Sequence, residues 1–161
     1  MSSVADLTRA VLGAQSDRIQ CYHTLEKTFS AAVAQKEFTA YAALLPSVTA
    51  QFESTSALVR RHLEAIERVG WAEGASLVQT LQELERHKLQ NMVRTHQLIT
   101  DFTIRSSRDD AAPSQEEFLA FDAQRRTLAQ ERSSLIGQIN EVIEVLREEM
   151  RLQTEEGCDE G

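Results

Sequence analysis

One repeat near the C-terminus, apolar except for two arginines, constrains the fold of this chain more than any other feature. Its members recur alternately three and four residues apart: Phe118, Phe121, Arg125, Leu128, Arg132, Leu135, Ile139, Val142 and Leu146. A period of about 3.5 residues, held over about four heptads, is typical of a helix that packs lengthwise against other helices. The repeat therefore predicts a long helix built for packing against protein.

Helix breakers are scarce along the whole chain. The 161 residues include only two prolines and six glycines, and 42% of the residues are hydrophobic. This composition favours helices over strands, and we find no alternating apolar and polar run long enough to predict a strand. A chain of this length can bury one helical core and is short for two. We therefore expect a single all-α domain over residues 1–153.

The apolar spacing divides this domain into four predicted helices. Their approximate ranges are 3–34, 38–69, 75–104 and 115–153. Gly70 and Gly74 mark a turn, Ser114 with Glu117 predicts a capping box, and Pro46 predicts a kink or a restarted helix. Connections of a few residues make neighbouring helices antiparallel. The prediction is an elongated antiparallel four-helix bundle, or a pair of helical hairpins, whose long last helix partly overhangs its neighbours.

The charge pattern argues against direct, tight binding of nucleic acid. The formal net charge is -8, whereas proteins that bind nucleic acid unaided normally show a basic footprint. Part of the negative charge lies in residues 154–161, for which we predict an acidic disordered tail. Local arginine clusters are expected to be solvated surface or ion pairs.

The sequence also bears on the compartment of the protein. Cys21 and Cys158 lie far apart and do not indicate a disulfide framework. No apolar run approaches the roughly 18 residues that span a membrane. We therefore expect an intracellular protein, nuclear or cytoplasmic, without a membrane span.

The chain lacks the short motifs by which helical enzymes hold metals or phosphates. It has no Glu-x-x-His pair, no Cys-x-x-Cys and no glycine-rich phosphate loop. Glu83 and His87 share one helix face but lack a third ligand. We expect no catalytic residue, no cofactor, no metal and no small-molecule substrate, so the protein is predicted not to be an enzyme.

The second half of the last predicted helix carries a stripe that is too broad for one helical seam. We predict that this helix binds a protein partner or a second copy of the chain, through Arg125, Arg132, Ile136, Ile139, Ile143 and Met150. The two arginines leave an alternative open, because their heads could also pair with glutamates of a neighbouring helix. Trp71, between two glycines, is expected to cap the bundle end or to anchor a partner.

Several short motifs resemble a known family when they are taken in order. They are Arg18-Ile19-Gln20-Cys21-Tyr22, Phe29, Phe38, Tyr41, Thr49-Ala50-Gln51-Phe52, Ser56, the run from Leu81 to Gln90, Ile139-Asn140-Glu141 and Leu146-Arg147-Glu148-Glu149. In these positions the chain resembles the Required-for-excision 1-B domain family of DNA repair proteins. The resemblance implies a role in DNA excision repair and transfers no catalytic or binding residue.

Two functions agree with the sequence. The first is a non-enzymatic helical interaction factor that resembles an accessory protein of DNA repair and acts through protein contacts. The second is a structural coiled-coil subunit of a cytoskeletal, ciliary or tethering assembly with no repair role. The heptad pattern fits both functions equally well, and only the family resemblance favours the first.

Overall fold

The computed structural model describes residues 2–108 and 112–159. Over these residues the chain forms four helices, α1 (Val4–Gln35), α2 (Thr39–Arg68), α3 (Ala72–Ser106) and α4 (Gln115–Asp159), and no strand. The predicted all-α fold is confirmed, and the helix ends agree closely with the predicted ones everywhere except at the end of α4.

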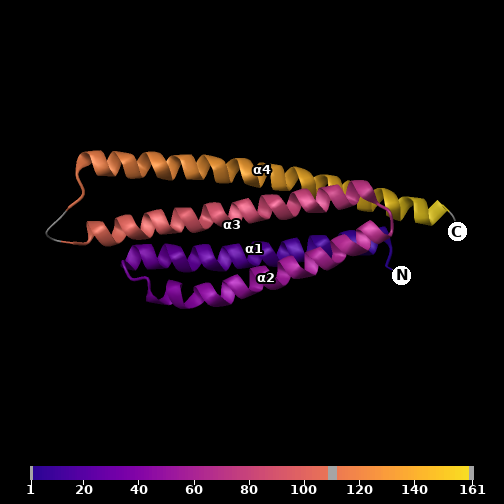
Figure 1. Cartoon of the computed structure of the whole chain (residues 1–161), viewed down its shortest axis with the longest axis horizontal. Coiled ribbons are helices and arrows are strands. Elements are labelled where there is room, and N and C mark those ends of the chain that lie inside the picture. The colour runs from indigo at the N-terminus through magenta and orange to yellow at the C-terminus, as the bar shows by residue number, and fades with distance from the viewer. Residues whose placement is uncertain (1, 109–111, 160–161) are drawn as a thin grey trace.

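The four helices form an elongated antiparallel bundle. Figure 1 shows α1 beside α2 and α3 beside α4, with both chain ends at the same end of the molecule. Contacts of α1 with α4 and of α2 with α3 close the bundle. Helix α1 also contacts α3, which lies diagonally opposite to it in the bundle. The short α1–α2 and α2–α3 connections leave successive helices no room for another arrangement.

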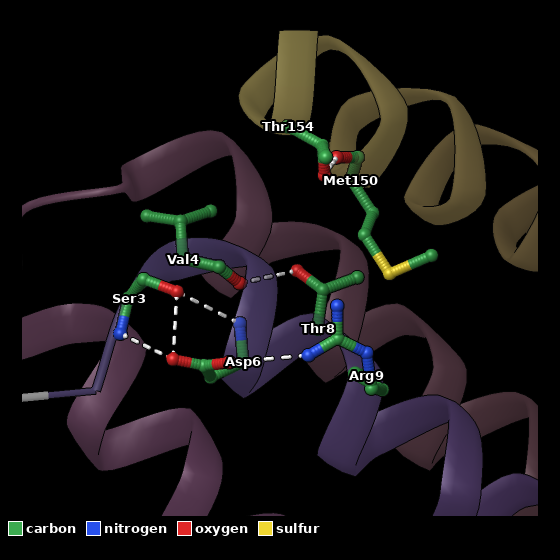
Figure 2. Close-up of polar contacts among 7 residues, drawn as sticks. All are labelled: Ser3, Val4, Asp6, Thr8, Arg9, Met150 and Thr154. Atoms are coloured by element: carbon green, nitrogen blue, oxygen red, sulfur yellow. Dashed lines mark hydrogen bonds and ion pairs between the residues drawn. The ribbon is translucent and has the colours of Figure 1, made fainter. Parts of the chain in front are cut away.

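Capping boxes define the starts of α1 and α4. Ser3 begins α1 with a capping box, in which the Asp6 N–H donates to Ser3 Oγ at 3.1 Å and the Ser3 N–H donates to Asp6 Oδ2 at 3.2 Å (Figure 2). The capping box predicted for α4 is also present. The Glu117 N–H donates to Ser114 Oγ at 3.2 Å, and the Ser114 N–H donates to Glu117 Oε2 at 3.3 Å. Lys36 ends α1 in the left-handed conformation, with a φ of 53°.

The turn between α2 and α3 depends on two glycines and a tryptophan. Gly70 has a φ of 78°, a conformation that glycine adopts without strain. The Trp71 ring lies directly over Gly74, and a Cβ atom at Gly74 would collide with that ring. Trp71 is half-buried against the adjoining core. It therefore caps this end of the bundle, as one of the two sequence interpretations expects.

Helix α2 is continuous through Pro46, so the predicted alternative of a restarted helix is not observed. Proline removes the backbone donor that would otherwise bond to the carbonyl of Ala42. Both residues are exposed to solvent. Water can therefore satisfy the freed carbonyl, and the helix tolerates the proline.

Helix α4 is longer than predicted. It continues to Asp159, so residues 154–159 of the predicted disordered tail are helical, whereas 160–161 lie outside the described residues. Arg151 donates to Glu148 at 2.7 Å and to Glu155 at 2.5 Å, and such pairs one turn apart stabilise exposed helices. The last turns project past the other helices (Figure 1), which is the overhang that the sequence predicts.

The core consists of two clusters. The first lies at the end that holds both termini and takes side chains from all four helices, among them Val11, Val59, Val78 and Leu146, each fully buried. The second is aromatic and takes side chains from α1, α2 and α3 only: Cys21, Tyr22, Leu25, Phe29, Ala32, Tyr41, Val48, Phe52 and Met92. Helix α4 therefore contributes to the core from Leu135 onward, and none of its residues before Leu135 belongs to either cluster.

Candidate functional site: a polar cluster below the α2–α3 groove

An arginine lies in the middle of the apolar face of α1. Arg18 is one turn from both Ala14 and Tyr22, and only 2% of its surface is exposed. Its guanidinium donates to Gln82 Oε1 of α3 and to Ser56 Oγ of α2, the latter at 3.3 Å. Burial lowers the pKa of Arg18 from its usual value, but arginine stays charged in proteins. One buried cation thus joins three helices.

Glu85 of α3 is the charge partner of Arg18, but the two side chains do not touch. Gln15 lies between them, accepting from Arg18 Nη1 at 3.4 Å and donating to Glu85 Oε1 at 2.5 Å. Tyr22 donates its hydroxyl to Glu85 Oε2 at 3.0 Å, and the Lys88 ammonium lies 4.0 Å from the centre of the Tyr22 ring. Glu85 is 4% exposed, so its negative charge depends on these donors for stabilisation.

Burial changes the acid–base properties of this cluster. It raises the pKa of Tyr22 far above the usual value, and the neighbouring Glu85 charge raises it further. It also lowers the pKa of Lys88, an effect that Glu85 opposes. The Tyr22 hydroxyl therefore stays protonated and acts as a hydrogen-bond donor to the carboxylate.

A groove between α2 and α3 opens above the cluster. Its volume is about 870 Å³, and Arg18 and Tyr22 belong to its lining. Arg60 of α2 and Arg86 of α3, both exposed, contribute one further cation from each side. Apolar side chains, Phe52, Leu63, Leu84 and Leu89, line other parts of it. The groove therefore combines positive charge with apolar surface.

The residues predicted to bind a partner lie in different environments. Ile139 and Ile143 are 3% and 7% exposed, packed in the four-helix core with residues of α1 and α3. The reason is that α1 runs antiparallel along the C-terminal half of α4 and covers their stripe. The folded chain leaves these two side chains no surface for a partner, so this part of the prediction is corrected. Ile136 is 38% exposed and Met150 is half-buried.

The two predicted arginines are already paired. Arg132 Nη1 lies 2.7 Å from Glu26 Oε1 and so links α4 to α1, which is the alternative that the sequence left open. Arg125, about half exposed, lies 3.0 Å from Asp122 of its own helix. Both arginines line a second groove, of about 450 Å³, between α1, α3 and α4.

His96 forms the wall of this second groove and was not singled out from the sequence. Its Nδ1 lies 2.8 Å from the Tyr41 hydroxyl, and its ring stacks on Phe29 with centroids 3.8 Å apart. Burial lowers the pKa of His96 to about 4, and the Arg132 charge adds to this effect. His96 is therefore a neutral side chain at physiological pH.

The sequence signal for Arg18, Glu85 and His96 was their position. Each occupies a place in a helical period where an apolar residue is expected, for example four residues after Ala14, Leu81 or Met92. A polar residue at such a place must find partners inside the protein. The sequence alone does not show which residues of other helices these partners are.

Neither a metal site nor a membrane helix is found in the part of the chain that the structure describes. No group of three or more histidine, cysteine, aspartate or glutamate side chains there could hold a metal ion. None of the described helices is long and apolar enough to cross a membrane.

The fold and the cluster define an all-α protein in which three helices share one buried polar network. A family model described as DNA repair REX1-B matches residues 6–99, more than half of the chain. The chain belongs to this family and is therefore a DNA-repair-related protein, which implies an intracellular one. No curated protein and no solved structure matches it.

The family match has a clear structural extent. It covers α1 from Asp6 onward, all of α2, and α3 as far as Ile99. The polar cluster and the two arginines beside it lie within this segment. Helix α4 lies outside it, including the motifs at 139–141 and 146–149 that contributed to the sequence resemblance.

Proposed function

We propose that this chain is a non-enzymatic accessory factor of DNA repair that acts by binding other proteins through its helix surfaces. Membership of the DNA repair REX1-B family supports the repair role. The observation that best supports protein binding is an aromatic surface at the end of the α3–α4 hairpin. This surface consists of Phe102, Phe118 and Phe121, together with Leu119, which follows Phe118 in α4, and we call it the hairpin-end surface.

The hairpin-end surface is apolar and open to solvent. The Phe102 and Phe121 rings stack with their centroids 4.0 Å apart. The centroid of the Phe118 ring lies 6.0 Å from that of Phe102. Phe118 and Leu119 are 53% and 58% exposed, whereas Phe102 and Phe121 are half-buried. Contiguous exposed apolar side chains mark interaction sites, and aromatic residues are enriched at the centres of protein interfaces.

The chemistry of the polar cluster supports a role without catalysis. A catalytic acid, base or nucleophile must present a reactive atom to a substrate. The donors of Arg18 are directed at the oxygens of Gln82, Ser56 and Gln15. Glu85 accepts from Gln15 and Tyr22. Because these groups bind one another across three helices, their arrangement favours a role in holding the bundle together.

The structural-subunit alternative has less support. It relied on the heptad period of the last helix as a seam for an external coiled coil. Leu135, Ile139 and Leu146 of this seam are buried against the chain's own helices. The period is thus used for packing within the chain along the C-terminal half of α4.

A complementation experiment tests the proposal. In cells that lack this chain, the wild-type chain should restore survival after ultraviolet damage, and Phe118→Glu/Leu119→Glu should not. A matched control is Ile19→Glu/Val93→Glu, since Ile19 and Val93 are each 53% exposed but lie elsewhere. The control should restore survival. Far-ultraviolet circular dichroism of all three purified proteins should show the same helix content.

Three results would contradict the proposal. Equal rescue by the two glutamate variants would remove the hairpin-end surface from the function. Unchanged survival of cells without the chain would remove the repair role. Tight binding of the purified chain to duplex DNA, with a steep decrease in affinity as salt rises, would indicate direct action on DNA instead of protein contact.

A further inference from the structure

We propose that the α2–α3 groove binds an acidic segment of a partner protein, in which carboxylates alternate with apolar side chains. This inference builds on the proposed function, because it assigns the chemistry of one partner to a second surface. It is argued from the charge of the groove, the placement of its arginines and its apolar lining.

The first argument is the sign of the charge. Three arginines line the groove, Arg18, Arg60 and Arg86, against two carboxylates, Glu83 and Glu85. With histidine neutral, these five residues sum to +1, whereas the whole chain carries -8. The groove is therefore a local positive region on a negative molecule, and it favours a ligand of negative charge.

The second argument is that these arginines are not neutralised by direct ion pairs. Arg18 is held by the amide oxygens of Gln15 and Gln82 and by the Ser56 hydroxyl, all of which are uncharged. Across the described residues, none of the ion pairs involves Arg60 or Arg86. A carboxylate that entered the groove would meet the exposed guanidinium groups of Arg60 and Arg86, which can form paired hydrogen bonds with it, while the buried Arg18 contributes charge only.

The third argument is the position of the cations relative to the apolar lining. Arg60 belongs to α2 and Arg86 to α3, so one cation comes from each helix that borders the groove. Phe52, Leu84 and Leu89 supply apolar lining to the same groove. A segment lying along the groove would place apolar side chains on this lining and carboxylates beside the arginines.

A nucleic acid fits these observations less well. The two exposed cations, Arg60 and Arg86, suit a ligand with a few separated carboxylates, whereas a nucleic acid brings a continuous row of phosphates toward a chain of charge -8. The apolar lining also has no role in binding a phosphate backbone. The observations therefore favour a protein segment with separated carboxylates.

Fluorescence anisotropy with a defined probe tests this inference on the full chain. The probe is a fluorescein-labelled peptide in which pairs of glutamates alternate with single leucines. We expect saturable binding that weakens as salt rises. Arg60→Gln/Arg86→Gln should weaken it roughly fivefold or more, since each exposed ion pair contributes modestly. Arg61→Gln/Arg94→Gln, which removes two exposed arginines outside the groove lining, should change it less than roughly twofold.

The outcomes separate this inference from the proposed function. Failure of the probe to bind, or equal affinities of the two double variants, would overturn the acidic-segment site. Equal binding of a peptide with glutamine in place of every glutamate would do the same. Preferential binding of a labelled DNA duplex through Arg60 and Arg86 would replace the protein ligand by nucleic acid. The complementation test uses Phe118 and Leu119, so its result does not depend on this groove.

Discussion

Replacing Arg18 by methionine should destabilise the bundle strongly. Methionine keeps an unbranched stem of similar length in the apolar face of α1 but removes the guanidinium. Gln82, Ser56 and Gln15 then lose a donor each. Gln15 is 4% exposed, so its oxygen loses its partner in a dry environment, whereas the other two border the groove and can bond to water.

The expected cost can be worked from these contacts. A buried acceptor without a partner costs about 1–3 kcal/mol. Glu85, 4% exposed, also loses the nearby positive charge, and breaking a buried charge pair from one side costs about 3–5 kcal/mol. Because Gln15 and Tyr22 still donate to Glu85, we place the total near the lower end, at about 3 kcal/mol.

A second variant separates the cost of leaving the Glu85 charge without Arg18 from the cost of losing the hydrogen bonds that Arg18 donates. Arg18→Met/Glu85→Gln removes both charges, while the glutamine can still accept from Tyr22. It should therefore recover about 1–2 kcal/mol relative to Arg18→Met, a coupling of the size seen between residues in one network. Arg60→Met, at an exposed arginine, is the control and should change stability by less than about 0.5 kcal/mol.

Urea unfolding followed by far-ultraviolet circular dichroism measures these differences. Equal slopes of the unfolding transition are needed, so that midpoint shifts report stability. The reasoning is refuted if Arg18→Met costs less than about 1 kcal/mol. With Glu85→Gln measured as the second single variant, the reasoning is also refuted if the costs of the two single substitutions simply add to that of the double variant, because the two charges would then not depend on each other.

Two further predictions concern other parts of the bundle. His96 has a pKa of about 4 in the folded chain against 6.5 for the ordinary side chain, so the unfolded state binds more protons between these values. Its contribution to stability is complete above pH 6.5 and should fall by about 3 kcal/mol as the pH decreases to about 4. Urea midpoints of the wild type and of His96→Gln across this range isolate the effect, and parallel pH curves would contradict it. Gly74→Ala should displace the Trp71 ring and cost about 1–3 kcal/mol, with a shift in tryptophan fluorescence. Gly13→Ala, where nothing lies within 4 Å of the added Cβ, should stabilise the chain by about 0.5–1 kcal/mol, and equal thermal midpoints of the two variants would contradict the packing argument.

Helix positions were accessible from the sequence because their signals are local. The capping box at Ser114 and Glu117 and the glycine at Gly70 act within one turn of the chain. The apolar period likewise identifies the buried face of each helix. These signals do not specify how far one helix slides along another.

The sequence interpretation went wrong in deciding which part of the α4 repeat packs inside the bundle. It assigned the broad stripe of the second half of this helix to a partner. The structure shows the reverse, with Phe118 53% exposed and Leu146 fully buried. The α3–α4 hairpin extends past the ends of α1 and α2 (Figure 1), so the first rungs of α4 have only α3 beside them. A long-range contact, Asn91 Nδ2 to the Leu128 carbonyl at 2.9 Å, helps to set this register.

The polar cluster could be predicted only in part, for the same reason. The position of Arg18 in an apolar period indicates that it is buried, but its partners come from α2 and α3, many residues away in sequence. Nothing in the sequence around Ser56 or Gln82 indicates that either side chain accepts a hydrogen bond from Arg18. This becomes visible only once α1, α2 and α3 are packed together. The position of a charged residue within a helical period therefore indicates that it is buried. Which groups stabilise that charge depends on the tertiary structure.

The two proposed binding surfaces belong to different parts of this architecture. The groove is formed chiefly by α1, α2 and α3, whose aromatic core cluster contains no residue of α4. The hairpin-end surface requires α4, which lies beyond the family match at residues 6–99. Because the two surfaces share no residue and no contact partner, their variants should act independently. Combining Arg60→Gln/Arg86→Gln with Phe118→Glu/Leu119→Glu should therefore leave the peptide affinity equal to that of the arginine variant alone.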